Sequence, residues 1–189
     1  MPERVCPWWM GRLLLNPWRR WSVKPDQLLE QYVHDGMTVL EPGPGMGFFT
    51  LSLARLVGAN GRVIAVDLQS RMLDRLRRRA QKAGLESRIE TRIATCESMR
   101  VTDLTGNVDF VLASAVVHEM PGAARFFLDA AAVLKPGALL LLVEPVGHVK
   151  SETFAGEVRA AKAAGLMTVN GPVVRGNHTI LLRKSFAAV

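Results

Sequence analysis

Three glycines occupy alternate positions in the segment Val39-Leu-Glu-Pro-Gly-Pro-Gly-Met-Gly. They are Gly43, Gly45 and Gly47, and the apolar residues before them are typical of a buried β-strand. Glycines at the end of a strand let the chain turn sharply and bring main-chain N–H groups close to a ligand. These glycines therefore mark a candidate ligand-binding loop, and the residues around it indicate which ligand.

Two carboxylates near the loop discriminate between cofactors. Asp67 follows the predicted strand 62–66, about 20 residues beyond the glycines, where an acid accepts both hydroxyls of an adenosine ribose. Glu41 precedes the loop, where its charge favours an ammonium group and disfavours a pyrophosphate. The glycine spacing is GxGxG, whereas dinucleotide dehydrogenases use GxGxxG. S-adenosylmethionine, with its ammonium and sulfonium, therefore fits better, and an NAD-dependent oxidoreductase is the weaker alternative.

Short apolar runs alternate with amphipathic stretches along the chain, a pattern that indicates βαβ units and a parallel α/β sheet. Such a sheet gathers the loops that follow its strands at one edge, where the glycines and Asp67 would meet. The expected strands are 37–41, 62–66, 89–94, 109–114 and 138–144. The expected helices are 48–57, 69–83, 121–134 and 151–164. A terminal antiparallel hairpin should follow, formed by residues 166–174 and 179–184.

Three segments in order resemble the motifs of class I S-adenosylmethionine-dependent methyltransferases. They are the glycine segment, Val63-Ile-Ala-Val-Asp67 and Leu134-Lys-Pro-Gly-Ala138, and the resemblance covers residues 25–184. It is strongest to the small-molecule branch that includes the ubiquinone and menaquinone enzymes. The resemblance implies a Rossmann-like sheet of seven strands in the order 3-2-1-4-5-7-6, mostly parallel with strand 7 antiparallel, and helices on both faces. It also implies an enzyme that uses S-adenosylmethionine.

The same resemblance assigns the cofactor contacts. Glu41 and the three glycines would hold the methionine moiety, Asp67 the ribose, and Leu68 the adenine. After the third strand, Thr95 or Glu97 stands where the family often has an adenine-binding Asp. The full set of expected cofactor contacts is Glu41, Gly43, Gly45, Gly47, Asp67, Leu68, Thr95, Cys96, Glu97 and Ser114.

The segment after the fourth predicted strand carries the candidate acid/base groups, His118 and Glu119. A base assists methyl transfer when the acceptor is a hydroxyl, so His118 is the candidate catalytic residue, with a packing role as its alternative. The strand exit lacks the Asn/Asp-Pro-Pro-Tyr/Phe motif of enzymes that methylate nucleobase amines. We expect no metal, because the His and Cys residues are scattered. We expect methyl transfer to a small molecule, at a phenol- or quinol-like hydroxyl or an activated carbon.

Residues 1–24 form the first of two predicted units and contain all four tryptophans of the chain. We predict a lid over the substrate side of the methyltransferase domain, which would span residues 25–189. Aromatic packing onto that domain is one alternative. Peripheral membrane contact through residues 8–21 is another, because Trp with Arg suits a lipid interface.

Composition sets the remaining expectations. The chain has 189 residues, of which 49% are hydrophobic, enough for a complete core, and its apolar runs are too short to span a bilayer. We expect a cytoplasmic protein and leave its oligomeric state open. The net charge of +7 is concentrated in residues 1–24 and 71–92. The basic residues of the helix 71–83 are typical of a solvated helix face. Two alternatives stay open: they bind the substrate of an RNA- or protein-directed methyltransferase, or they belong to a nucleic-acid-binding module.

Overall fold

Seven strands form one sheet in the order β3-β2-β1-β4-β5-β7-β6. β7 runs antiparallel to both of its neighbours, and the other pairs are parallel, which confirms the predicted topology. This computed structural model describes residues 24–186 of the chain. The strands are β1 (Thr38–Pro42), β2 (Arg62–Asp67), β3 (Ile89–Ile93), β4 (Val108–Ser114), β5 (Leu134–Pro145), β6 (Leu166–Val169) and β7 (Asn177–Lys184).

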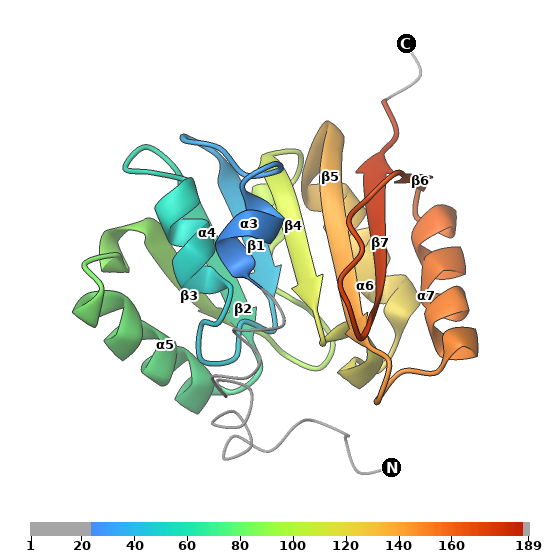
Figure 1. Cartoon of the computed structure of the whole chain (residues 1–189), viewed down its shortest axis with the longest axis horizontal. Coiled ribbons are helices and arrows are strands. Elements are labelled where there is room, and N and C mark those ends of the chain that lie inside the picture. The colour runs from blue at the N-terminus through green and yellow to red at the C-terminus, as the bar shows by residue number, and fades with distance from the viewer. Residues whose placement is uncertain (1–23, 187–189) are drawn as a thin grey trace.

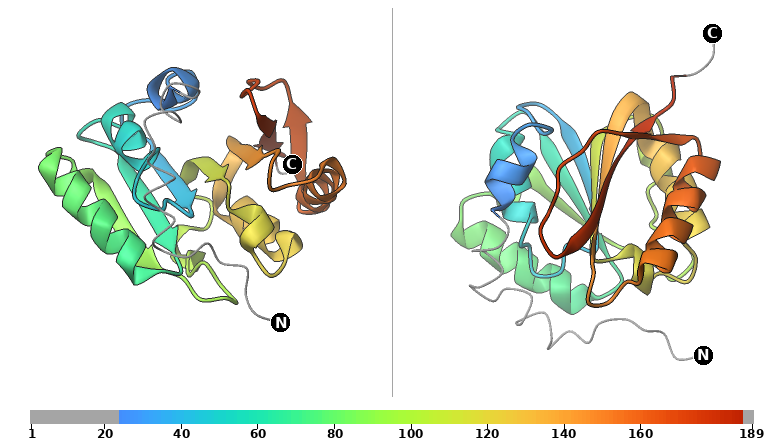
Figure 2. Two further views of the ribbon diagram at one scale, coloured as in Figure 1. Left: turned by 60° about the horizontal axis from the view of Figure 1, so that its bottom comes forward. Right: turned by 45° about the vertical axis from the view of Figure 1, so that its right-hand side comes forward.

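Helices cover both faces of the sheet (Figures 1 and 2). One face packs against the first three helices of the described residues, and the other packs against the last two. The successive strand residues Val63 and Ile64 belong to these opposite cores, as the alternation of side chains along a strand requires. The helices are α3 (Pro25–Leu29), α4 (Thr50–Leu56) and α5 (Ser70–Lys82) on the first face, and α6 (Ala123–Val133) and α7 (Ser151–Ala163) on the second.

Several predicted boundaries differ from the observed ones, and three of them have a plain description. β5 begins at Leu134 rather than at residue 138, because the Lys-Pro-Gly sequence forms an irregularity in its pairing with β4 instead of a separate turn. β6 ends at Val169 rather than at residue 174, since Gly171 and Pro172 follow, and proline has no N–H to donate to a ladder. α6 begins at Ala123, two residues later than expected.

The parallel strands direct five connecting segments to one edge of the sheet. β1 leads into the glycine loop, β2 ends at Asp67, and β3, β4 and β5 lead into residues 94–101, 115–122 and 146–150. Three short 3-10 helices complete the connections: η1 (Glu86–Arg88), η2 (Thr102–Leu104) and η3 (Val117–Glu119). η3 lies in the segment after β4.

The predicted lid, residues 1–24, and the membrane-contact segment 8–21 lie outside the described residues, apart from Lys24. The division into two units therefore stays a prediction. Across residues 24–186, none of the helices combines the length and the apolar character that a membrane span requires.

Candidate active site

The glycine loop follows β1 in a left-handed backbone conformation. Gly43, Gly45 and Gly47 have φ values of 65°, 53° and 83°. A Cβ atom at Gly43 would lie 2.5 Å from Cγ2 of Val116, whereas a Cβ at Gly45 would meet nothing within 4 Å. The loop is therefore pressed against the segment after β4 at Gly43 and is open on one side at Gly45.

A cavity of about 410 Å³ lies at this edge of the sheet. Its walls come from the segments that follow β1, β2, β3 and β4, together with the start of α6. Seven of the predicted cofactor residues line it: Gly43, Gly45, Asp67, Leu68, Thr95, Cys96 and Glu97. The structure therefore brings together residues from three separate loops that the sequence had assigned to one ligand.

Four predicted site residues do not line this cavity: Glu41, Gly47, Ser114 and His118. Gly47 is buried, and a Cβ there would lie 2.5 Å from Leu76 of α5, so this glycine allows close packing between loop and helix. Ser114 is the last residue of β4 and pairs with Val143 of β5. Its place in the sheet gives it no direct contact with the cavity.

Glu41 lies in β1, next to the loop. Its side chain is 3% exposed, and its Oε2 atom has no hydrogen-bond partner among the described residues. Burial raises the pKa of Glu41 to about 8, the nearby hydroxyl of Thr50 opposes this effect, and the carboxylate of Asp67 adds to it. A buried carboxylate oxygen that lacks a donor suits an ammonium group, because that group supplies both the hydrogen bond and the charge. The residues present therefore fit the methionine end of S-adenosylmethionine.

Asp67 ends β2 and faces the cavity. Its Oδ1 accepts a hydrogen bond from the backbone N–H of Gln69 at 2.8 Å. Burial raises the pKa of Asp67 to about 6, hydrogen bonds from backbone N–H groups, including that of Gly45, oppose this effect, and the carboxylate of Glu119 adds to it. At neutral pH this side chain is mostly ionised and can accept hydrogen bonds from two adjacent hydroxyls.

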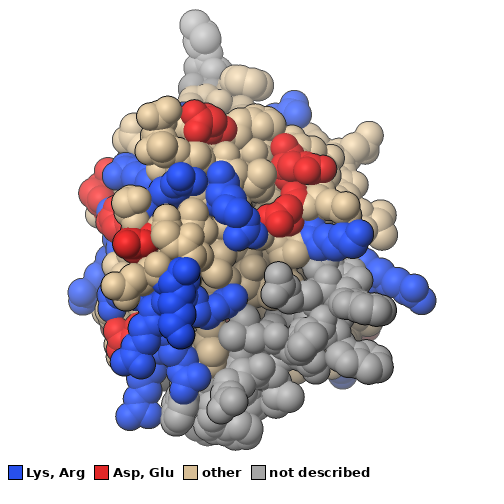
Figure 3. Space-filling view, turned by 60° about the vertical axis from the view of Figure 1, so that its left-hand side comes forward, with Lys and Arg blue, Asp and Glu red and all other residues tan. Residues whose placement is uncertain are grey.

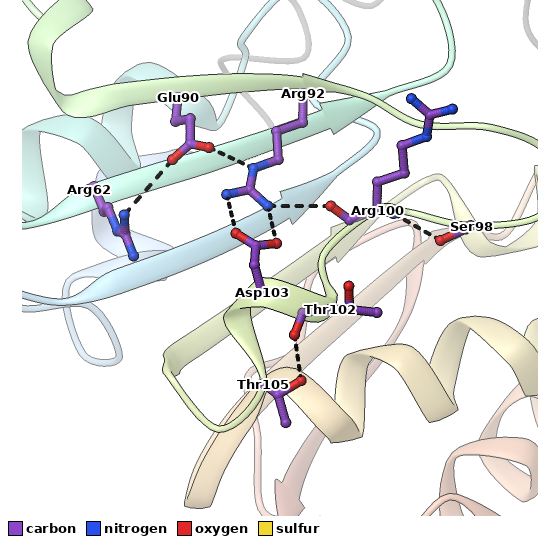
Figure 4. A network of polar contacts seen from close by, with 8 residues as sticks. All are labelled: Arg62, Glu90, Arg92, Ser98, Arg100, Thr102, Asp103 and Thr105. Atoms are coloured by element: carbon purple, nitrogen blue, oxygen red, sulfur yellow. Dashed lines mark hydrogen bonds and ion pairs between the residues drawn. The ribbon is translucent and has the colours of Figure 1, made fainter.

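A charged network holds the segment after β3 in place (Figure 4). Arg92 makes two hydrogen bonds to Asp103, of 2.6 and 2.8 Å, and one of 2.6 Å to Glu90. It also donates to the carbonyl oxygen of Arg100 at 3.3 Å, and the N–H of Arg100 donates to Oγ of Ser98 at 3.0 Å. Because Ser98 lines the cavity, this network supports its wall. No local sequence signal marks Arg92 or Asp103 as partners, because they lie 11 residues apart.

Arginines of α5 contact the glycine loop. A guanidinium N–H of Arg79 donates to the carbonyl oxygen of Met46, and Nη1 of Arg75 lies 3.9 Å from the sulfur atom of the same residue. Met46 stands between Gly45 and Gly47, so α5 supports the centre of the loop. Other basic side chains of this helix are exposed, and Figure 3 shows Lys and Arg gathered on this side of the molecule.

Replacing Arg79 by Leu should weaken binding of S-adenosylhomocysteine by about 1–2 kcal/mol, because the loop loses a charged hydrogen bond. Calorimetric titration measures this change. Arg78→Leu is the matched control, since Arg78 is the exposed neighbour and should leave the affinity unchanged. Equal losses in both variants would contradict a specific role for Arg79. The nucleic-acid interpretation of α5 makes a different prediction: both variants would lower RNA affinity.

The segment after β4 forms another wall of the cavity. Ala115 has a φ of 54°, unusual for a residue with a side chain, and its N–H donates to the carbonyl oxygen of Val143 at 2.8 Å. Val116 and Glu119 line the cavity, and His118 lies between them in sequence. Nδ1 of His118 lies 2.6 Å from Oε2 of Glu144, a residue that the sequence analysis did not single out.

No group of three or more His, Cys, Asp or Glu residues within residues 24–186 is arranged to hold a metal ion.

Comparison with known proteins places this chain in a family. A family described as "Methyltransferase domain" matches residues 33–174. The arsenite methyltransferase of Halobacterium salinarum is 34% identical over 111 residues, which are 59% of this chain and 28% of that protein. The ubiquinone/menaquinone biosynthesis C-methyltransferase of Klebsiella pneumoniae is 31% identical over 112 residues, 59% of this chain and 44% of that protein. The matched region thus spans less than half of either relative.

A solved structure shows the same fold over nearly the whole chain. The S-adenosylmethionine-dependent methyltransferase of Aquifex aeolicus superposes with a TM-score of 0.83 at 24% identity. The superposition covers 95% of this chain and 99% of that one.

Proposed function

This chain belongs to the methyltransferase domain family, as a class I domain that uses S-adenosylmethionine, and we propose that it transfers a methyl group to a small-molecule acceptor. One observation carries the cofactor assignment. A buried carboxylate oxygen of Glu41 that has no hydrogen-bond partner among the described residues lies next to the glycine loop. When bound, S-adenosylmethionine supplies an electrophilic methyl carbon attached to a sulfonium.

The chain's own residues would hold the two ends of the cofactor. Glu41 and the backbone of the glycine loop suit the charged methionine end. Asp67 suits the ribose hydroxyls, and Leu68 with residues 95–97 lines the part of the cavity assigned to adenine. Binding across three loops would fix the position of the reacting carbon, which is the main requirement of an in-line displacement.

The proposed class of methyl acceptor rests on the position of two side chains and on the named relatives. Both named relatives act on compounds other than nucleic acids, as their names state: one on arsenite, and one in quinone biosynthesis. His118 and Glu119 lie at the carboxyl end of β4, where substrate groups approach in sheets of this type. We propose a phenol- or quinol-like hydroxyl, or an activated carbon, as the methyl acceptor, and His118 as the acid/base group.

The cofactor assignment is tested by calorimetric titration with S-adenosylhomocysteine and, separately, with NADH. We expect micromolar binding of the first and none of the second, because Glu41 favours an ammonium and disfavours a pyrophosphate. Binding of NADH alone would overturn the proposed function. With cofactor binding established, a panel of phenols and quinols is the first substrate screen.

Replacing Asp67 by Ala should weaken binding of S-adenosylhomocysteine by about 1–3 kcal/mol, through the loss of charge-assisted hydrogen bonds to the ribose. Titration calorimetry on the folded variant measures this loss. Asp74→Ala serves as the control, since Asp74 lies on the exposed side of α5, paired with Arg77. An unchanged affinity in Asp67→Ala would show that this carboxylate does not contact the ligand.

A further inference from the structure

Glu144, near the end of β5, is completely buried and holds η3 with both of its carboxylate oxygens. Its side chain is 0% exposed. Oε1 accepts a hydrogen bond from the backbone N–H of Val117 at 2.8 Å, and Oε2 lies 2.6 Å from Nδ1 of His118. Both partners belong to η3, in the segment whose neighbouring residues Val116 and Glu119 line the cofactor cavity.

This arrangement determines where His118 carries its hydrogen. An ionised carboxylate only accepts hydrogen bonds, so Nδ1 of His118 must be the donor. In the neutral imidazole, Nε2 then keeps its lone pair and can take a proton. Nε2 lies 4.0 Å from Oε1 of Glu119, a residue of the cavity wall, and the His118 side chain is 16% exposed. The basic nitrogen is therefore close to the rim of the cavity and partly accessible.

We propose that Glu144 is a positioning residue that holds His118 as the general base of methyl transfer, and that the acceptor therefore presents a hydroxyl group. The inference rests on the proposed function. In the transfer, Nε2 of His118 takes the hydroxyl proton and the acceptor oxygen bonds to the methyl carbon. The carbon–sulfur bond breaks with its electron pair on sulfur, and the proton then leaves His118 for solvent.

Three other titratable side chains lie around the imidazole. Glu119 lies on η3 itself, Glu157 on α7, and the His148 ring centroid is 6.3 Å away in the segment after β5. The hydrogen bond to Glu144 raises the pKa of His118 above its ordinary value of 6.5, burial opposes this effect, and the charges of Glu144, Glu119 and Glu157 add to the increase. Since the base acts in its neutral form, kcat/KM should increase with pH through that raised pKa.

Nitrogen-15 NMR of the histidine side chains tests the arrangement without any turnover. The chain has four histidines, so the signals can be assigned with single substitutions. We expect neutral His118 to carry its hydrogen on Nδ1. His178 is an internal reference, because its Nε2 lies 3.0 Å from the carbonyl oxygen of Val149, which requires the hydrogen on Nε2. A wild-type His118 with its hydrogen on Nε2 would overturn the proposal.

Glu144→Gln should reverse this tautomer. The N–H of Val117 requires the amide oxygen, so the amide NH2 would face Nδ1 and donate to it, which moves the hydrogen of His118 to Nε2. The base is then lost, and kcat should fall at least 100-fold with little change in KM. Glu152→Gln, on the exposed start of α7, is the matched control and should behave as wild type. If Glu144→Gln does not fold, the wild-type spectrum still decides the question.

The acceptor class is tested by the formation of S-adenosylhomocysteine with hydroquinone, catechol and a prenylated benzoquinol between pH 6 and 9. We expect the wild type to turn over at least one of them with a rate that increases with pH, and Glu144→Gln to lose both most of the turnover and this pH dependence. An enzyme that binds S-adenosylhomocysteine and methylates none of them overturns the hydroxyl assignment. Failure to bind S-adenosylhomocysteine at all would instead contradict the proposed function, and the NMR result would stand separately.

Discussion

Replacing Glu41 by Gln should weaken binding of S-adenosylhomocysteine by about 2–3 kcal/mol and also stabilise the ligand-free protein above neutral pH. Both effects come from one buried carboxylate whose Oε2 has no donor. In the complex, that oxygen would accept a hydrogen bond from the ammonium group of the ligand. The amide of glutamine carries no charge to pair with the ammonium. Without ligand, the ionised carboxylate is a cost that the amide does not have.

The pH dependence of this effect has a definite sign. The pKa of Glu41 is raised from an ordinary value of 4.5 to about 8, so between these values the folded protein binds a proton that the unfolded chain releases. The unfolding free energy of the ligand-free wild type should therefore decrease as pH rises from about 4.5 to about 8, by at most about 5 kcal/mol from this group. Asp67 and Glu157, with pKa values raised to about 6 and about 7, contribute in the same direction.

The difference between wild type and variant isolates Glu41, because the other carboxylates are present in both proteins. Denaturant unfolding at pH 5 and pH 8 should give similar stabilities at the lower pH and a more stable Glu41→Gln variant at the higher one. Methylthioadenosine, which lacks the amino acid moiety, is the matched ligand and should bind both proteins equally. Equal binding of S-adenosylhomocysteine by both would show that Glu41 does not hold the ammonium.

Local sequence patterns were sufficient to predict most elements of the fold. α5 was predicted because Met72, Leu76 and Ala80 recur at helical spacing, and these side chains are buried. β2 was predicted from an apolar run, and its central residues lie in the cores of both faces. The order of the strands, by contrast, came from the resemblance to a family. The pairing of β1 with β4 depends on contacts between distant residues, which periodicity does not contain.

The residues of the site also fall into two groups, those marked by a local sequence pattern and those defined by contacts between distant residues. Glycines and acids at strand ends are visible in the sequence, because a strand followed by Gly or Asp is a local signal. The supporting contacts are not local: Glu144 lies 26 residues from His118, Arg92 lies 11 residues from Asp103, and Arg79 lies 33 residues from Met46. For Glu144, a charged residue within an otherwise apolar strand was the available signal, since a buried charge requires a partner.

Replacing Gly43 by Ala should destabilise the protein by about 2–4 kcal/mol, the largest effect expected from a single methyl group in the loop. Two independent costs add at this position. The φ of 65° strains any residue with a Cβ, and the new atom would lie 2.5 Å from Cγ2 of Val116 and 2.8 Å from its Cβ. Relief of the contact requires the loop or the segment after β4 to move. Because Gly43 and Val116 both line the cavity, affinity for S-adenosylhomocysteine should fall at least tenfold as well.

A double-mutant cycle separates the two costs. Val116→Ala removes the atom that the new methyl group meets most closely, so Gly43→Ala should cost less in that background, by about 1–2 kcal/mol, while the strain of φ and the 2.8 Å contact with Cβ of residue 116 remain. Gly45→Ala gives the strain alone, since its φ is 53° and nothing lies within 4 Å of its Cβ, and should cost about 1–2 kcal/mol. Denaturant unfolding measures all four proteins of the cycle together with Gly45→Ala. Additive effects of Gly43→Ala and Val116→Ala would mean that the loop does not press on the Cγ atoms of Val116, and that the strain of the backbone and the contact with Cβ account for the loss.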